Sequence, residues 1–86
     1  MASYSVEFSK NVRKDLRKIP NTDAAIILKR IQELAVAPRP HDSRKLKGEE
    51  LFRIRIGAYR VIYEIEDARL VVFIVRVKHR KDAYRN

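Results

Sequence analysis

The chain has 86 residues, of which 45% are hydrophobic; this content argues against an intrinsically disordered protein, and the length predicts one domain over residues 1–86. It contains no cysteine, so disulfides, thiolate metal sites and cysteine nucleophiles are excluded. Twenty Lys and Arg against eleven Asp and Glu give a net charge of +9, which predicts an anionic partner such as a nucleic acid, an acidic protein or a lipid surface.

The first part of the chain predicts a strand followed by a helical hairpin. Polar and apolar residues alternate over 2–8, as in a strand with one buried face. Ser9 is a suitable N-cap for a helix that ends at Pro20. Apolar residues then recur at helical spacing over 23–36, with Asn21-Thr22-Asp23 as the expected cap. The tight turn at Pro20 makes the two helices antiparallel.

The second part of the chain predicts three strands after a polar loop over 37–50. The strands are expected over 51–56, 59–65 and 70–77, and their short connections predict antiparallel hairpins. A strand, a helical hairpin and a three-stranded antiparallel meander that form one sheet define an α+β fold. The last strand is apolar at nearly every position, so we expect it to lie centrally with both faces covered.

Cations gather on these strands and after the last of them. Arg53 and Arg55 alternate with apolar residues, so both are expected to project from the face of the sheet turned away from the helices. The full candidate set is Lys45, Lys47, Arg53, Arg55, Arg60, Lys78, His79, Arg80, Lys81 and Tyr84. Guanidinium groups make bidentate hydrogen bonds to phosphate, and they would stabilise a pentacoordinate phosphorus transition state. The set therefore predicts a site for a phosphodiester.

Cleavage of RNA at such a site needs no metal if the neighbouring 2′-OH attacks the phosphorus. We expect no metal site, because His41 and His79 lack ligand spacing and the acidic residues are scattered. No cofactor is expected either, since Gly48 and Gly57 are the only glycines and cannot form a phosphate-binding loop.

The sequence also predicts where the protein acts. No apolar stretch reaches the roughly 20 residues of a membrane span, and the N-terminus lacks a signal-peptide core. A soluble, cytoplasmic protein without membrane contact is therefore expected. The cations between Lys10 and Lys18 form either the solvated face of an amphipathic helix or an RNA contact, and the sequence leaves both open.

Three runs carry a resemblance to a known family. They are Lys45-Leu-Lys-Gly48, Leu51-Phe-Arg-Ile-Arg-Ile-Gly-Ala-Tyr-Arg-Val-Ile-Tyr63 and Val71-Val-Phe-Ile-Val-Arg-Val-Lys-His-Arg-Lys-Asp-Ala-Tyr-Arg85. With the opening strand and helical hairpin, they resemble the RelE/ParE superfamily of toxin–antitoxin toxins over essentially the whole chain. RelE-type members are ribosome-dependent mRNA endonucleases that cut the codon in the A site by 2′-OH attack. The resemblance therefore implies an mRNA interferase that inhibits translation.

The resemblance also implies roles for individual residues. Arg53, Arg55, Arg60, Arg80 and Tyr84 match the catalytic set of RelE-type members, and Tyr84 follows a shorter spacer than in some relatives. Lys45, Lys47, Lys78, His79 and Lys81 are expected to bind RNA. Some relatives carry lysine where this chain has Arg53 and Arg55. Arginine is a poor general base because its pKa exceeds about 12, so Lys45, Lys47, His79 or Tyr84 would accept the proton.

The implied partners are a cognate antitoxin, the ribosome and mRNA. An acidic, amphipathic antitoxin segment would suit a basic surface, and operator DNA would be contacted only indirectly through the antitoxin. Two other functions remain open: a ParE-like inhibitor of DNA gyrase, and a non-catalytic nucleic-acid-binding module. Retention of the five matching residues favours the RelE type.

Overall fold

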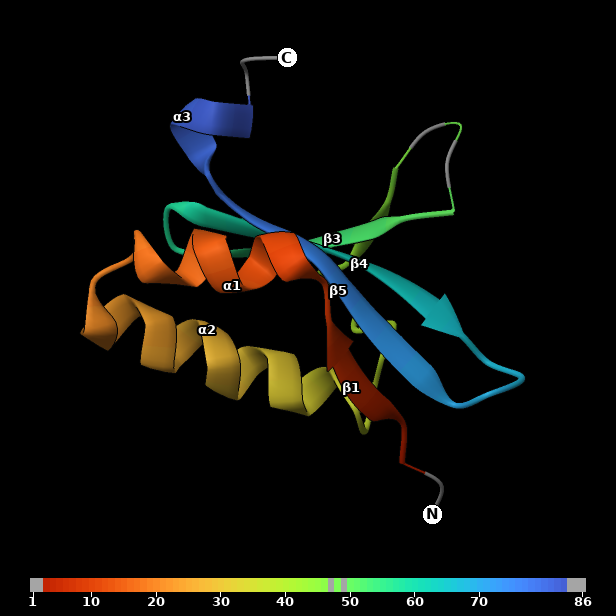
Figure 1. The fold of residues 1–86 in the computed structure, drawn as a ribbon. Helices are drawn as coiled ribbons and strands as arrows, with labels where there is room; N and C mark the ends of the chain where they lie inside the picture. The colour runs from red at the N-terminus through yellow and green to blue at the C-terminus, as the bar shows by residue number, and fades with distance from the viewer. Residues whose placement is uncertain (1–2, 47, 49, 84–86) are drawn as a thin grey trace.

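The computed structural model describes residues 3–46, 48 and 50–83, which form two long helices and a mixed sheet (Figure 1). In chain order the elements are β1 (Ser5–Phe8), α1 (Lys10–Arg17), α2 (Asn21–Leu34), β2 (Arg44–Lys45), β3 (Phe52–Ile56), β4 (Tyr59–Glu66), β5 (Val71–His79) and α3 (Arg80–Ala83). The strand order is β1-β5-β4-β3-β2. β1 pairs with β5 in parallel, and the other neighbours are antiparallel. The predicted α+β fold is confirmed.

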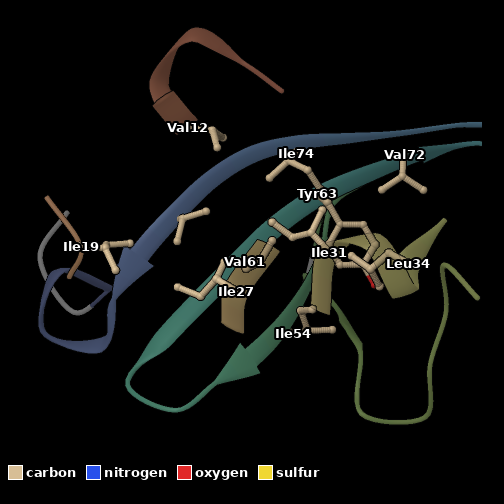
Figure 2. Close-up of a cluster of buried hydrophobic side chains, with 11 residues drawn as sticks. Val12, Ile19, Ile27, Ile31, Leu34, Ile54, Val61, Tyr63, Val72 and Ile74 are labelled. Carbon is tan, nitrogen blue, oxygen red and sulfur yellow. The ribbon is translucent and has the colours of Figure 1, made fainter. Parts of the chain in front are cut away.

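α1 and α2 pack on the same face of the sheet, which we call the inner face; the opposite face is the outer face. The buried cluster combines residues from both helices and from β3, β4 and β5 (Figure 2). Its members include Val12, Ile27, Ile31, Leu34, Ile54, Val61, Tyr63, Val72 and Ile74. Because Ile54 is fully buried there, its neighbours Arg53 and Arg55 lie on the outer face, as the alternation predicted.

The helix ends agree with the sequence at one cap and differ at the other. Ser9 is the N-cap of α1: its Oγ accepts a hydrogen bond from the Val12 amide at 3.3 Å and donates one to the Val75 carbonyl at 2.7 Å. The cap expected at 21–23 is wrong, because α2 already begins at Asn21, with Pro20 at the N-cap position and no side-chain cap. Proline suits this helix start because its φ is fixed near the helical value. No helix in the described ranges is long and apolar enough to cross a membrane.

β5 lies between β1 and β4, but the expectation that both its faces are covered is wrong. Its inner side chains are buried, whereas Phe73 and Val75 on the other side are only half-buried. Both long helices lie on the inner face, so neither covers the outer side of β5 (Figure 1). The apolar run indicated burial correctly for the inner face and for Val71 at the start of the strand, but not for Phe73 and Val75.

A β-bulge changes the direction of the side chains in the second half of β5. Tyr63 pairs with Ile74, but Ile62 pairs with Arg76, so Val75 is an extra residue in β5. Val77 is consequently buried on the inner face, and Lys78, which pairs with Arg60, belongs to the outer face, while Arg76 turns its guanidinium to Asp15 of α1. The bulge thus decides which residues at the end of β5 join the cations of β3 and β4.

Two short elements were not predicted. β2 lies within the region expected to be a polar loop and pairs with β3, and α3 follows β5 directly. The connection before β2 is held to α2 by Arg30, whose Nη2 donates to both carboxylate oxygens of Asp42 at 2.7 and 2.6 Å. These bonds keep the pKa of Asp42 below its ordinary value.

Candidate nucleic-acid interface

Cations of four strands meet on the outer face. Residues that pair across antiparallel strands point to the same side of the sheet. Three such pairs consist of two cations each: Arg44 with Arg53, Arg55 with Arg60, and Arg60 with Lys78. We call these five residues together with Arg80 the outer cationic patch.

The patch places like charges opposite each other across the strands. Like charges directly opposite each other in a sheet are destabilising, and the patch contains three pairs of this kind, two of which share Arg60. A polyanion bound across the patch would remove this repulsion and release its own counterions. The arrangement therefore fits the binding of a nucleic-acid backbone better than it fits a stabilising role.

Arg80 completes the patch from outside the sheet. Its backbone amide donates a 2.7 Å hydrogen bond to the Ala58 carbonyl, which holds the start of α3 against the turn between β3 and β4. Gly57 in that turn has a φ of 59°, a backbone conformation that favours glycine. A pocket of about 180 Å³ opens here; it is lined by Arg55, Gly57, Ala58, Tyr59, Arg60 and Arg80. Three guanidinium groups from β3, β4 and α3 therefore share one small pocket.

His79 is not brought to this pocket. It pairs with Tyr59, and the two rings meet edge to face with centroids 5.2 Å apart and an interplanar angle of 89°. Tyr59 packs against the core, so His79 pairs on the inner side of the sheet, and it is not among the residues that line the arginine pocket. Its Nδ1 also accepts a hydrogen bond from the Lys81 amide at 3.1 Å.

The other predicted residues are divided between the two sides of the sheet. Lys45 pairs with Phe52, whose side chain packs against the core, so it leaves the edge strand on the inner side, with its Nζ 3.7 Å from the Glu50 carboxylate. Lys81 is exposed on α3. Lys47 and Tyr84 lie outside the described residues.

Arg44 was missed by the sequence analysis, although it belongs to the patch. It lay in the expected loop, and only its pairing with Arg53 shows which face of the sheet it occupies. Its Nη1 donates to the carbonyls of His41 at 3.1 Å and Ser43 at 2.9 Å. No local sequence signal identifies a strand of two residues, so the register of the sheet was needed to find it.

Arg76 has a structural role at the edge of the patch. Its Nε and Nη2 donate to the two carboxylate oxygens of Asp15 in α1 at 2.9 and 3.0 Å. Asp15 is 10% exposed and also accepts a hydrogen bond from the Val77 amide at 2.9 Å. One carboxylate therefore joins α1 to β5 beyond the end of β1, and it neutralises a charge beside the patch.

A second cationic surface lies on α1. Lys10, Arg13, Lys14 and Arg17 line an open pocket of about 380 Å³ together with the exposed ring of Phe8. Their spacing puts them on one side of the helix. Within the part of the chain described, His, Asp and Glu side chains form no group of three able to hold a metal ion.

The fold and the sequence relate this chain to known toxins. The family described as ParE toxin of type II toxin–antitoxin system, parDE, matches residues 6–84. The toxin RelG of Mycobacterium tuberculosis is 37% identical over 95% of this chain and 97% of its own length. The mRNA interferase toxin RelE of Escherichia coli is 28% identical over 92% of this chain and 85% of its own length.

A solved structure gives the same assignment. The toxin–antitoxin complex RelBE2 from Mycobacterium tuberculosis contains a chain that superposes with a TM-score of 0.84 at 34% identity, covering 95% of this chain and 97% of that one. The architecture is therefore that of the RelE-like α+β toxins. The chain itself belongs to the ParE/RelE family of toxins of type II toxin–antitoxin systems.

Proposed function

We propose that this toxin is a ribosome-dependent mRNA endonuclease that cuts the codon in the A site and so inhibits translation. The observation that carries the proposal is the pocket in which Arg55, Arg60 and Arg80 converge on a face of like-charge pairs. The Escherichia coli relative is named an mRNA interferase, which supports the same activity.

The reaction consists of an attack of a 2′ oxygen on the adjacent phosphorus, without a metal. The new bond joins the 2′ oxygen to phosphorus, and the bond from phosphorus to the 5′ oxygen breaks. The 2′-OH proton passes to an acceptor, the leaving 5′ oxygen receives a proton, and the products are a 2′,3′-cyclic phosphate and a 5′-hydroxyl. Arg60 and Arg80 hold the scissile phosphate, and Arg53 and Arg55 stabilise the charge that develops on it or on its neighbour.

The placement of the candidates narrows the search for the proton acceptor. Lys45 and His79 leave the sheet on the inner side, opposite to the patch. We therefore favour Lys47 and Tyr84 among the four candidates for this role, and Tyr84 follows α3 and Arg80 closely in the sequence. Tyr84 is the preferred candidate, because the start of α3 is held against the pocket by the Arg80 amide.

The partners follow from the same surfaces. The cations on α1 and Lys45 are suited to ribosomal RNA, because they do not line the pocket and would contact phosphates without taking part in the reaction. The RelBE2 structure is a toxin–antitoxin complex, which supports a cognate antitoxin for this chain. An acidic, amphipathic antitoxin segment would match the charge of the patch.

The test is mRNA cleavage in a reconstituted translation system, with and without ribosomes. We expect wild-type protein to cut within A-site codons only when ribosomes are present, and a 2′-deoxy nucleotide at the cut site to abolish cleavage. Arg60→Ala/Arg80→Ala should be inactive, whereas the matched control Arg69→Ala should be active, because Arg69 lies in the turn between β4 and β5 and pairs with Glu66.

Intact mRNA with folded wild-type protein would contradict the proposal. Because the family match carries the ParE description, the same preparation is then tested for inhibition of DNA supercoiling by gyrase. Inhibition would establish the gyrase function. Nucleic-acid binding with neither activity would identify a non-catalytic binding module.

A further inference from the structure

A second pocket lies beside the proposed catalytic one on the outer face. It has a volume of about 320 Å³ and is lined by Asp42, Arg44, Arg53 and Arg55. Arg55 lines both pockets, so the two adjoin at this residue of β3. Three guanidinium groups against one carboxylate leave this second pocket, which we call the β2–β3 pocket, with a positive charge.

The cations of the β2–β3 pocket are spaced as successive anionic groups of a chain would require. Arg55 and Arg53 are two residues apart on one strand, which separates their Cα atoms by about 6.7 Å along β3. Arg44 lies directly opposite Arg53 on the neighbouring strand, about 5 Å away. A linear polyanion that passes Arg55 would therefore meet a second pair of cations one step further along.

Arg44 is held in place for such a contact. Its Nη1 donates to the backbone carbonyls of His41 and Ser43, so the guanidinium is oriented by its own connection. A guanidinium has five N–H donors, and both of these bonds use the same nitrogen; an anion can therefore approach the Nη2 side without breaking them.

The single carboxylate of the β2–β3 pocket is already engaged. Both oxygens of Asp42 accept hydrogen bonds from Arg30 in α2, at 2.7 and 2.6 Å. Arg30 thus offsets the one negative charge that would repel a phosphate here. The same pair fixes the connection that carries Arg44, so the orientation of Arg44 depends on α2.

We propose that the β2–β3 pocket binds the phosphate next to the scissile one in a single-stranded RNA, with Arg44 as a substrate-positioning residue. The RNA strand then runs along β3, from the pocket of Arg60 and Arg80 past Arg55 to Arg53 and Arg44. This inference rests on the proposed function for the identity of the reacting phosphate, but binding of the RNA strand can be tested without cleavage.

The binding test uses a short single-stranded oligoribonucleotide made resistant to cleavage by one 2′-O-methyl group. Wild type, Arg44→Gln and the control Arg69→Gln are titrated at several salt concentrations. Arg44→Gln should weaken binding about tenfold, as expected for one charge-assisted contact. The slope of log K against log salt should become shallower by about 0.7, the value for one single-strand phosphate contact. The Arg69→Gln control should behave as wild type.

A second measurement identifies the phosphate. One phosphate at a time, on either side of the blocked position, is replaced by an uncharged methylphosphonate. At one of these positions the replacement should weaken wild type about tenfold and leave Arg44→Gln unchanged, because the contact is already lost. If Arg44→Gln keeps the wild-type salt slope, or if no adjacent position couples to it, the inference is wrong even when wild type cleaves mRNA. If the coupling is found but wild type cuts no mRNA, the β2–β3 pocket stands and the proposed nuclease function fails.

Discussion

The two faces of this sheet are made by the same strands and have opposite properties. On the inner face, Ile54 of β3 and Val61 of β4 are both fully buried under the helices. On the outer face, the residues adjacent to them in these strands, Arg55 and Arg60, oppose each other with like charges. Because side chains alternate along a strand, one pair of strands serves both purposes. The comparison teaches that substitutions on the inner face should change stability, whereas those on the outer face should change activity.

The arginines of the molecule divide in the same way. Arg30, Arg39 and Arg76 each donate two hydrogen bonds to a single aspartate, and each bond pair joins segments far apart in the sequence. Arg55, in contrast, faces another arginine across the strands. Net charge alone could not distinguish an arginine that is bound to an aspartate from one that lies opposite another arginine.

The outer face should give the largest effect on activity. Arg60→Gln removes one donor at the proposed transition state and should lower ribosome-dependent cleavage by about 10²–10³-fold. It also removes two like-charge pairs, with Arg55 and with Lys78, and the free energy of unfolding should stay near the wild-type value. Single-turnover cleavage and thermal denaturation measure the two effects. A variant that is both inactive and destabilised would show that Arg60 is a structural residue.

The inner face should give the opposite result. Ile54→Ala leaves a cavity between β3 and the helices and should lower the free energy of unfolding by about 3 kcal/mol. Cleavage per folded molecule should stay near wild type, because the side chain does not reach the outer face. Stability is measured by denaturant unfolding, and activity by cleavage at denaturant concentrations at which the variant is still folded. Arg55→Gln on the same strand is the control, and it should lose activity without losing stability. Equal losses of activity in both variants would contradict the division of the sheet into a stabilising inner face and an active outer face.

Most helices and strands could be predicted from the sequence, because the periodicity of apolar residues is a local signal. The alternation in 51–56 correctly assigned Arg53 and Arg55 to the outer face, and Ser9 correctly marked the start of α1. The turn at Pro20 also gave the helical hairpin, although the cap of α2 was placed too late.

The end of β5 could not be assigned in this way. Without the bulge at Val75, strict alternation from Ile74 would place His79 on the outer face and Lys78 on the inner face. The extra residue exchanges them, and its carbonyl is held by Ser9, which lies 66 positions away in the sequence. Asp15 in α1 contacts the two residues that follow. The residue pattern of β5 contains no information on these long-range contacts. The structure was therefore needed to decide which residues at the end of β5 belong to the outer cationic patch.

The smallest effect is expected at the end of β4 away from the patch, where the predicted change is in the response to acid. The carboxyl of Asp67 accepts hydrogen bonds from Arg39 at 3.2 and 2.8 Å and from the Tyr4 hydroxyl at 2.6 Å, which lower its pKa from 3.8 to about 2. Because the folded-state pKa is the lower one, this stabilisation is present above about pH 4 and is lost as the pH falls towards 2. Asp67→Asn should therefore flatten the decrease of Tm between pH 4 and pH 2, while cleavage at neutral pH stays unchanged, since Arg60 lies at the opposite end of β4. Thermal denaturation between pH 2 and pH 4 measures this change. Glu64→Gln on the outer face is the control, because it also removes one carboxylate. If Tm falls with pH equally in Asp67→Asn and wild type, the hydrogen bonds of Asp67 contribute nothing to stability in acid.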